Sequence, residues 1–413
     1  MRILFLNPVG VLGGAERVLL DLFEPLQRVD PGIDLVLVTG TDGPLVARAA
    51  ALGVITEVVA MPPSLTHLGE HGFNFRNAGA VIRALASAAE GGGEAAVYLG
   101  RIARAIRRFE PSLIHSNGIK THLLSALFAP RNVPIVWHLH DFVGDRALAS
   151  HALRATARLA TSAIANSDAV AKDARQVLGP RIPIDVVHNA INTAHYAPGA
   201  VDAASLDRLG GVAPAPVGTV RVGLVGTYAR WKGHELFLEA IKKVLARNLE
   251  QRARFYIVGG PIYRTAGSQF SETELREQAR RAGIAEHVVF VPFQEDLSDV
   301  YRALDVVVHA STRREPFGMV IVEAMATACA VVVADAGGAA ELFRHGEDAL
   351  GYEMGNADAL ASAMQTLIAD EGYRAQLGER ARRAAITHFS RDRIGAQLEK
   401  IYRGVLEKSR ARS

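Results

Sequence analysis

Short apolar runs rich in β-branched residues alternate with longer segments of helical periodicity along the whole chain. Near-continuous apolar runs are typical of strands in parallel sheets whose two faces are both covered by helices. In the first half of the chain the pattern predicts strands at residues 2–7, 34–40, 113–117, 134–140, 162–167 and 183–189. In the second half it predicts strands at residues 220–226, 253–260, 287–293, 305–311 and 330–338. We therefore expect an α/β protein with two doubly wound, Rossmann-like parallel sheets.

A segment rich in Ala, Pro and Gly separates the two series of strands, as at a domain boundary. A chain of 413 residues also exceeds the size that one hydrophobic core usually supports. We predict an N-terminal domain at 1–196, a linker at 197–218, a second domain at 219–389 and a terminal helix at 390–413. Two such domains facing each other would form a cleft at the carboxyl ends of their strands.

The composition narrows the class of protein. Apolar residues make up 49% and charged residues 22% of the chain, which is ordinary for a soluble enzyme. The net charge is +3 with no block of Lys and Arg, so we expect no nucleic-acid partner. The single cysteine, Cys329, excludes an internal disulfide and suits a reducing cytoplasm. We see no membrane-spanning apolar stretch, and the opening residues resemble a strand and turn, unlike a signal peptide.

Glycines follow the first predicted strand, at Gly10, Gly13 and Gly14, before a helix that starts near Ala15. Such a loop lets backbone N–H groups approach an anion at a helix N-terminus. The spacing does not match the dinucleotide motif G-x-G-x-x-G, and the second predicted strand ends without the acidic residue that binds ribose. A tight turn that requires positive φ angles is the simpler alternative.

Two further stretches in the second half suit a phosphate ligand. In VGTYARWKGHELFLEA (225–240), Lys232 stands where a helix begins and could place its ammonium group against a diphosphate. Arg230 adds a second cation, although both residues could also be ordinary solvated charges on a loop.

The stretch REPFGMVIVEAM (314–325) places Glu315 before a turn and Glu323 inside an apolar helix that starts near Phe317. Three N–H groups of its first turn could receive phosphate oxygens, those of Gly318, Met319 and Val320. Glu323 lies about one and a half turns further on, where its carboxylate could accept ribose hydroxyl groups. As a purely structural helix, this segment would bury an unpaired carboxylate, which is costly, so we expect a ligand or partner at Glu323.

E-P-F-G-x-x-x-x-E-A-M after a V-V-V-H-A-S strand resembles the E-x7-E motif of retaining glycosyltransferase family 4. The resemblance covers essentially the whole chain, from GGAER at its start through the segments WHLHD (137–141), ANSDAV (165–170), VVHNAIN (186–192), VGTYARWKG (225–233), IVGGP (257–261) and DAGGAAEL (335–342). It implies the GT-B architecture of two facing Rossmann-like domains, and a nucleotide-diphosphate sugar as donor.

The resemblance also implies a role for individual residues. As catalytic residues it implies His140, which would contact the donor sugar, and Glu315, which would hold the sugar hydroxyl groups. As donor-binding residues it implies Gly13, Gly14, Arg230, Lys232, Phe317, Gly318, Met319, Val320 and Glu323. Asn189 matches the family's hinge-side turn. The resemblance further implies that the first domain binds the acceptor and the second binds the donor, and that the terminal helix packs back across the domain junction. One position departs from the family, because Thr227 stands where an Arg is usual, and Arg230 is the candidate replacement.

The resemblance implies a retaining transfer in which cations and helix N–H groups stabilise the leaving diphosphate, with no metal and no further cofactor. The chain has no Asp-x-Asp pair of the kind that metal-dependent glycosyltransferases use. Three alternatives stay open. A metal-dependent hydrolase would use His138, His140 and Asp141 as ligands, although no second cluster completes the set. A sugar-nucleotide epimerase on the same fold and a catalytically silent sugar-nucleotide-binding protein are the others.

Residues 62–110 separate two strands of the first half and are the candidate acceptor-binding region. One helical stretch, FNFRNAGAVIRALASAAE (73–90), is followed by a second whose face is basic, with Arg101, Arg104, Arg107 and Arg108. A solvated helix face is the simple interpretation. The alternative is docking to anionic lipid at the inner face of the membrane, which would bring the enzyme to a glycan, glycolipid or lipid-linked acceptor.

Overall fold

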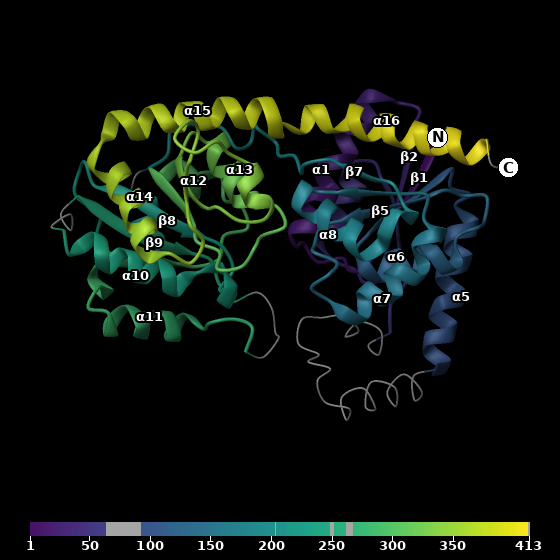
Figure 1. The fold of residues 1–413 in the computed structure, drawn as a ribbon, viewed down its shortest axis with the longest axis horizontal. Helices are drawn as coiled ribbons and strands as arrows, with labels where there is room; N and C mark the ends of the chain where they lie inside the picture. Colours follow the sequence, from purple (N-terminus) through teal and green to yellow (C-terminus); the bar gives the residue numbers. More distant parts are fainter. Residues whose placement is uncertain (63–91, 203, 248–251, 262–266, 412–413) are drawn as a thin grey trace. The chain divides into compact units, whose positions relative to one another are not determined.

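The structure, a computed structural model, describes five stretches of the chain: residues 1–62, 92–202, 204–247, 252–261 and 267–411. It divides into two compact units (Figure 1), and each contains one parallel sheet. The first unit consists of Met1–Ala190 and Arg391–Ser413, and the second is Ile191–Ser390. The segment 197–218, predicted as a linker, therefore belongs to the second unit, where it includes the short helix α9 (Ser205–Leu209).

In the described part of the first unit, seven parallel strands follow the order β3-β2-β1-β4-β5-β6-β7. They are β1 (Arg2–Asn7), β2 (Asp34–Thr39), β3 (Ile55–Val58), β4 (Leu113–Asn117), β5 (Ile135–Leu139), β6 (Ser162–Ala165) and β7 (Ile184–Val186). The helices are α1 (Gly14–Val29), α2 (Pro44–Ala51), α5 (Gly92–Arg108), α6 (Ile119–Phe128), α7 (Ala147–Thr156), α8 (Asp168–Leu178) and α16 (Arg391–Arg410). The strand order reverses between β1 and β4, and ligand sites of doubly wound sheets lie at the carboxyl ends of such a pair.

Successive side chains of a strand point to opposite faces, and β1 shows how each face is covered. Ile3 and Phe5 pack in a cluster with α1 and α16, whereas Leu4 and Leu6 pack with α5. The helix α16 buries an apolar stripe against α1, and Gly395 allows the close approach. A Cβ at Gly395 would lie 2.5 Å from the carbonyl oxygen of Pro25 in α1. The predicted terminal helix is therefore part of the first unit.

In the described part of the second unit, six parallel strands follow the order β10-β9-β8-β11-β12-β13. They are β8 (Val220–Val225), β9 (Ala253–Val258), β10 (Val288–Val291), β11 (Val306–His309), β12 (Ala330–Ala334) and β13 (Leu350–Tyr352). The longer helices are α10 (His234–Leu245), α11 (Glu272–Arg281), α12 (Ser298–Ala303), α13 (Met319–Ala326), α14 (Ala357–Ala369) and α15 (Glu371–Phe389). One apolar cluster joins the sheet to α10, α11 and α14, and the other joins it to α12, α13 and α15. Figure 1 shows α10 and α11 below the sheet and α12, α13 and α15 above it.

The structure confirms every predicted strand to within a few residues at its ends, and both sheets are parallel and Rossmann-like as expected. Two strands, β3 and β13, were not predicted. Both are short and lie at the edge of their sheet. An edge strand is covered less completely, so its sequence shows a weaker apolar pattern, and β3 is indeed only partly buried.

Candidate functional site

Two loops at the carboxyl ends of β8 and β11, together with the helix α13 that follows the second loop, carry most of the predicted donor-binding residues. The strand order of the second sheet reverses between these two strands. The loop after β8 contains the short helix η3 (Arg230–Lys232), and the loop after β11 leads into α13. The backbone N–H of Thr312 donates a 2.8 Å hydrogen bond to the carbonyl oxygen of Trp231. Gly233, at a φ of 79°, fits against the other loop so closely that a Cβ would lie 1.8 Å from the carbonyl oxygen of Ala310. The two loops are therefore held together by their backbones.

The carboxylate of Glu315 is the centre of a buried polar cluster formed by these loops. Its Oε1 accepts a short hydrogen bond from the ammonium group of Lys232. Its Oε2 accepts hydrogen bonds from His309 Nε2 at 2.6 Å and from Ser311 Oγ at 2.7 Å. A predicted catalytic residue, Glu315, and a predicted donor-binding residue, Lys232, thus bind each other, and two residues that were not predicted complete the cluster.

The charge of this cluster follows from its partners. Burial disfavours an ionised carboxylate, but Lys232 and His309 outweigh that effect and hold the pKa of Glu315 below its usual range. Glu315 is therefore ionised at neutral pH. Lys232 is the most accessible member, with 18% of its side chain exposed, and its ammonium group also lies 4.2 Å from the centre of the Trp231 ring. The cation can reach a ligand, whereas the carboxylate is fixed.

Glu323 is buried in α13, as predicted, and has a partner within the protein. The hydroxyl group of Tyr301 in α12 donates a 2.8 Å hydrogen bond to Glu323 Oε2. Burial, together with the neighbouring carboxylate, raises the pKa of Tyr301 well above its usual value, so the phenol stays a donor. The expectation of a ligand or partner at Glu323 is met at least in part by this tyrosine.

The start of α13 has the geometry that the sequence predicted, with one exception. Gly318 precedes the helix at a φ of 112°, in the left-handed region that favours glycine, and Met319 and Val320 form the first turn. The ring of Phe317, in contrast, is buried and lies edge-on to the ring of Phe389, with 6.0 Å between the two ring centres. Phe317 belongs to the core, so only its backbone could contact a donor.

Arg230 is directed toward α11. Its guanidinium donates to Glu274 Oε1 at 3.2 Å and to the carbonyl oxygen of Gly267 at 3.1 Å, and it lies 4.3 Å from the centre of the Phe270 ring. About half of the side chain is exposed. In the family an arginine usually stands at the position of Thr227, and Arg230 would have to leave these partners to take over its role. Lys232 is therefore the cation that already lies at the site.

In the first unit, the glycine loop after β1 is closed by a carboxylate. Glu16, in the first turn of α1, accepts a 3.1 Å hydrogen bond from the N–H of Gly13 and a 3.3 Å bond from Asn7 Nδ2. Burial raises the pKa of Glu16, while these hydrogen bonds act in the opposite direction. Gly14 is the first residue of the helix, and a Cβ there would meet nothing within 4 Å. The loop therefore keeps open space at Gly14, where the resemblance places a phosphate.

His140, after β5, is linked to this loop by a chain of hydrogen bonds. Its Nε2 forms a short hydrogen bond with Asn117 Oδ1, and Asn117 Nδ2 donates to Asn7 Oδ1 at 2.7 Å. Since the Asn117 amide nitrogen is already a donor to Asn7, its oxygen is the acceptor and His140 carries its proton on Nε2. Burial lowers the pKa of His140 to about 4, so the ring is neutral at pH 7. His140 thus presents an unprotonated Nδ1.

The ligand set of the alternative hydrolase is not assembled. His138 Nδ1 lies 3.2 Å from His115 Nε2, and His115 Nδ1 lies 2.8 Å from the hydroxyl group of Tyr402 in α16. Asp141 is directed away and accepts a 2.9 Å hydrogen bond from Arg146. Among the described residues, His138, His140 and Asp141 do not bring ligand atoms together. His138 is a buried residue of β5.

Five residues at these sites were not predicted from the sequence: His309, Ser311 and Tyr301 of the second unit, and Asn7 and Asn117 of the first. A signal was available for four of them, because each stands at or just after the carboxyl end of an apolar strand. A polar side chain there lies at the edge where ligand sites of parallel sheets form. Tyr301 gave no such signal, since only the packing of α12 on α13 brings it to Glu323.

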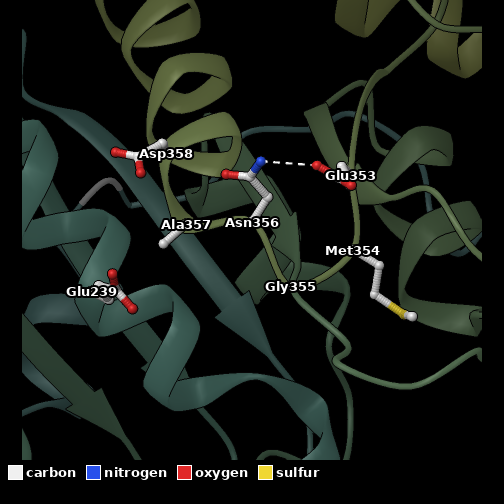
Figure 2. Close-up of a pocket in the computed structure, with 7 residues that line it drawn as sticks. All are labelled: Glu239, Glu353, Met354, Gly355, Asn356, Ala357 and Asp358. Carbon is white, nitrogen blue, oxygen red and sulfur yellow. Dashed lines mark hydrogen bonds between the residues drawn. The ribbon is translucent and has the colours of Figure 1, made fainter.

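The described residues also line a shallow cavity of about 430 Å³ at the start of α14 (Figure 2). Figure 2 shows Glu239 of α10 on one side and Glu353, Asn356 and Asp358 on the other, with Asn356 bound to Glu353. Lys243 donates to Asp358 at 2.7 Å. No residue predicted as donor-binding lines this cavity.

The basic face predicted for the first unit is present on α5, where Arg101, Arg104 and Arg107 are exposed. Arg108 pairs with Glu57 and lies over the Phe109 ring. The other helical stretch, 73–90, lies outside the described residues. None of the described helices combines the length and apolar character needed to cross a membrane.

The chain contains two Rossmann-like units, and in each the strand order of the sheet reverses at a pair of strands whose carboxyl ends carry polar residues. This arrangement defines a GT-B fold. Comparison with known families agrees in both halves of the chain. The model for Glycosyltransferase Family 4 matches residues 12–195, and the model for glycosyl transferases group 1 matches residues 213–384. Both halves of the chain thus match glycosyltransferase models, and these matches do not favour the epimerase or hydrolase alternatives.

Solved structures resemble the whole chain. The HepE protein of Anabaena, crystallised in complex with UDP, is 27% identical, with a TM-score of 0.79 over 98% of this chain and 100% of that one. HepE was also crystallised with UDP-glucose. A sucrose-phosphate synthase from Thermosynechococcus elongatus, at 19% identity, has the same fold, with a TM-score of 0.75 over 99% of this chain and 100% of that one.

Curated relatives match over shorter stretches. D-inositol 3-phosphate glycosyltransferase of Rhodococcus jostii is 35% identical over 53% of this chain and 47% of its own length. The lipopolysaccharide core biosynthesis mannosyltransferase LpcC of Rhizobium leguminosarum is 31% identical over 46% of this chain and 52% of its own. The chain thus spans about half the length of the curated relatives it matches.

Proposed function

We propose that the chain is a retaining glycosyltransferase that moves a sugar from a nucleotide-diphosphate sugar to a hydroxyl group of a glycan, glycolipid or lipid-linked acceptor. The observation that carries the proposal is the grouping of Lys232, Glu315 and the start of α13 at the carboxyl ends of β8 and β11. A cation and helix N–H groups suit a diphosphate, and a fixed carboxylate suits sugar hydroxyl groups. The HepE complexes with UDP and UDP-glucose support the same class of donor.

In this proposal, Lys232 and the backbone of residues 318–320 bind the diphosphate, and Glu315 accepts hydroxyl groups of the donor sugar. Glu323 accepts ribose hydroxyl groups, while the hydrogen bond from Tyr301 keeps its carboxylate in place. For Gly13, Gly14 and His140, the family resemblance implies contact with the phosphate and the reacting sugar.

The transfer needs no residue that becomes covalently bound to the sugar. The acceptor oxygen bonds to C1 of the sugar as the bond from C1 to the leaving phosphate oxygen breaks. The leaving diphosphate takes the acceptor's proton on the same face, so the configuration at C1 is retained. Lys232 and the N–H groups at the start of α13 stabilise the charge that develops on the diphosphate, without a metal ion. Glu315 orients the sugar.

The acceptor is proposed to lie at the inner face of the membrane. The exposed arginines of α5 would attract anionic lipid, each contributing on the order of 1 kcal/mol near such a surface. Sedimentation with liposomes of phosphatidylcholine, with and without phosphatidylglycerol, tests this. Binding that requires the acidic lipid and weakens with salt supports the idea, and equal sedimentation with both liposomes rejects it.

A panel of sugar nucleotides tested by thermal shift, beginning with UDP-glucose, addresses the donor, because a ligand that binds the folded state raises the melting temperature. Radiolabelled transfer to extracted membrane lipid, with and without EDTA, then tests the reaction. Product formation that depends on the acceptor and survives EDTA supports the proposal. Epimerised donor without transfer would support the epimerase, and nucleotide binding without any product would support the silent binding protein.

A further inference from the structure

The two oxygens of Glu315 face different surroundings. Oε2 is held by His309 and Ser311, whose exposed fractions are 4% and 1%, so this end of the carboxylate is inside the protein. Oε1 is bound only by Lys232 among the described residues, and that side chain is partly exposed. One oxygen is therefore enclosed by buried donors, whereas the other faces a cation that is partly exposed.

The donors to Oε2 are held by the backbone. His309 is the last residue of β11 and pairs with Val333 of β12, and Ser311 follows two residues later. Glu315 is itself fixed, since its carbonyl oxygen accepts a 2.7 Å hydrogen bond from the N–H of Gly338. Gly337, at a φ of 65°, passes so close that a Cβ would lie 2.7 Å from the same oxygen. Neither the carboxylate nor its two donors can move far.

The protons in this cluster can be assigned from its chemistry. An ionised carboxylate only accepts hydrogen bonds, so His309 carries a proton on Nε2 and Ser311 turns its hydroxyl hydrogen toward Glu315. His309 Nδ1 is buried and has no hydrogen-bond partner among the described residues. Nε2 is therefore the polar atom through which the His309 ring acts, 2.6 Å from Glu315 Oε2 and 3.0 Å from Ser311 Oγ.

Lys232 differs from the other two donors because its ammonium group ends a flexible chain and keeps contact with solvent. A diphosphate carries more charge than a carboxylate and would compete for this ammonium group. Once Lys232 turns to the diphosphate, Oε1 loses its partner and an ionised, buried oxygen is left to accept a new hydrogen bond. A hydroxyl group of the attached sugar can provide it.

We propose that His309 and Ser311 are positioning residues that hold Oε2 of Glu315 while Oε1 exchanges Lys232 for a hydroxyl group of the donor sugar. The inference rests on the proposed function and deepens it, because it gives the Lys232–Glu315 pair a role in sugar recognition. Lys232 thus leaves Glu315 for the diphosphate before a sugar hydroxyl group can bind Oε1. A nucleotide diphosphate without a sugar would also bind Lys232, but it would place no hydroxyl group on Glu315.

The test compares UDP with UDP-glucose by calorimetry in the whole chain, using His309→Leu, His309→Gln and Ser311→Ala. Without its donors, Glu315 should swing away from the sugar, so His309→Leu should weaken UDP-glucose binding about tenfold and leave UDP binding within about twofold. Gln carries an amide that can reach Oε2 and should restore most of the UDP-glucose affinity. Ser311→Ala should have the same selective effect to a smaller degree, and Thr366→Ala on α14 serves as a hydroxyl-removal control.

Each result has a distinct meaning. Equal loss of UDP and UDP-glucose affinity, or wild-type affinity for both, in His309→Leu and Ser311→Ala would overturn the role of these residues. If His309→Leu unfolds, Ser311→Ala and His309→Gln still decide the question, since both keep a polar or small side chain. A wild-type chain that binds neither UDP nor UDP-glucose would instead count against the proposed donor, and the positioning role would fall with it.

Discussion

Tyr301 donates a 2.8 Å hydrogen bond from its phenolic hydroxyl group to the buried carboxylate of Glu323. The two residues come from different helices, α12 and α13, and are 22 positions apart. The bond answers why a glutamate can lie among apolar residues of α13. It also means that a ribose, in the proposed complex, would join a carboxylate that is already held in place.

Removing the hydroxyl group should destabilise the chain, because the buried carboxyl group of Glu323 would lose a hydrogen-bond donor. We expect Tyr301→Phe to lower the free energy of unfolding by about 1–3 kcal/mol. Urea denaturation measures this, with Tyr373→Phe on α15 as the control for losing a phenol. A Tyr301→Phe protein as stable as the wild type would show that the bond contributes little.

Glu323→Ala should weaken nucleotide binding, because the ribose hydroxyl groups lose their acceptor. We expect the dissociation constant for UDP to rise about tenfold or more, as for the loss of a hydrogen bond to a charged group. Calorimetry provides the measurement, and Glu353→Ala at the separate cavity of Figure 2 is the matched control. Unchanged UDP affinity would remove Glu323 from the ribose site.

Lys232→Met should separate binding of the diphosphate from binding of the nucleoside. The substitution keeps the length of the side chain and removes its charge, so UDP affinity should fall by at least about tenfold while uridine affinity stays within about twofold. Arg230→Met is the comparison, and we expect a smaller loss because Arg230 is bound to Glu274. A larger loss for Arg230→Met than for Lys232→Met would reverse this ranking of the two cations.

Gly233→Ala should disrupt the joined loops. A Cβ would lie 1.8 Å from the carbonyl oxygen of Ala310, so the loops must separate and the melting temperature should fall by several degrees, for a loss of about 2 kcal/mol or more. Gly283→Ala is the matched control, since Gly283 has a φ of 73° and open space around it. That control isolates the cost of the positive φ, which is about 1 kcal/mol. Equal losses in the two variants would mean that the loops yield easily.

Acid should destabilise the first unit through its buried histidines. Burial lowers the pKa of His115 to about 3 and of His140 to about 4, compared with 6.5 in an unfolded chain. Between about pH 6.5 and pH 4 the unfolded state binds more protons, so stability is complete above pH 6.5 and is lost as the pH falls. Over this range, each such histidine should lower the free energy of unfolding by up to about 1.4 kcal/mol for every pH unit of acidification.

The check is the pH dependence of urea denaturation in wild type and His115→Gln. The variant should show a shallower loss between pH 6.5 and 4, whereas His151→Gln on the exposed side of α7 should follow the wild type. If the slopes of wild type and His115→Gln coincide, His115 does not carry the effect.

Much of the fold could be predicted because it depends on patterns that are local in sequence. Fully buried strands such as Leu113–Asn117 leave an unbroken apolar run, so β4 was placed with the same ends that the structure shows. The edge strands β3 and β13 are short and left no comparable run, and β3 is also only partly buried. The segment 197–218 has the composition of a linker, yet Asp207 within it pairs with Arg254 in β9 and makes the segment part of the second unit.

Local patterns were enough to predict the two parallel sheets, the resemblance to glycosyltransferases, and the segments after two strands that carry Lys232, Glu315 and Glu323, because periodicity and motif spacing are properties of the chain. The partners of these side chains follow from the tertiary structure. Lys232 and Glu315 are 83 positions apart, and they meet because parallel strands bring distant loops to one edge of a sheet. The packing of these loops also brings His309 and Ser311 to Glu315 Oε2 and Arg230 to Glu274. Side-chain contacts depend on packing in three dimensions, which no local pattern encodes.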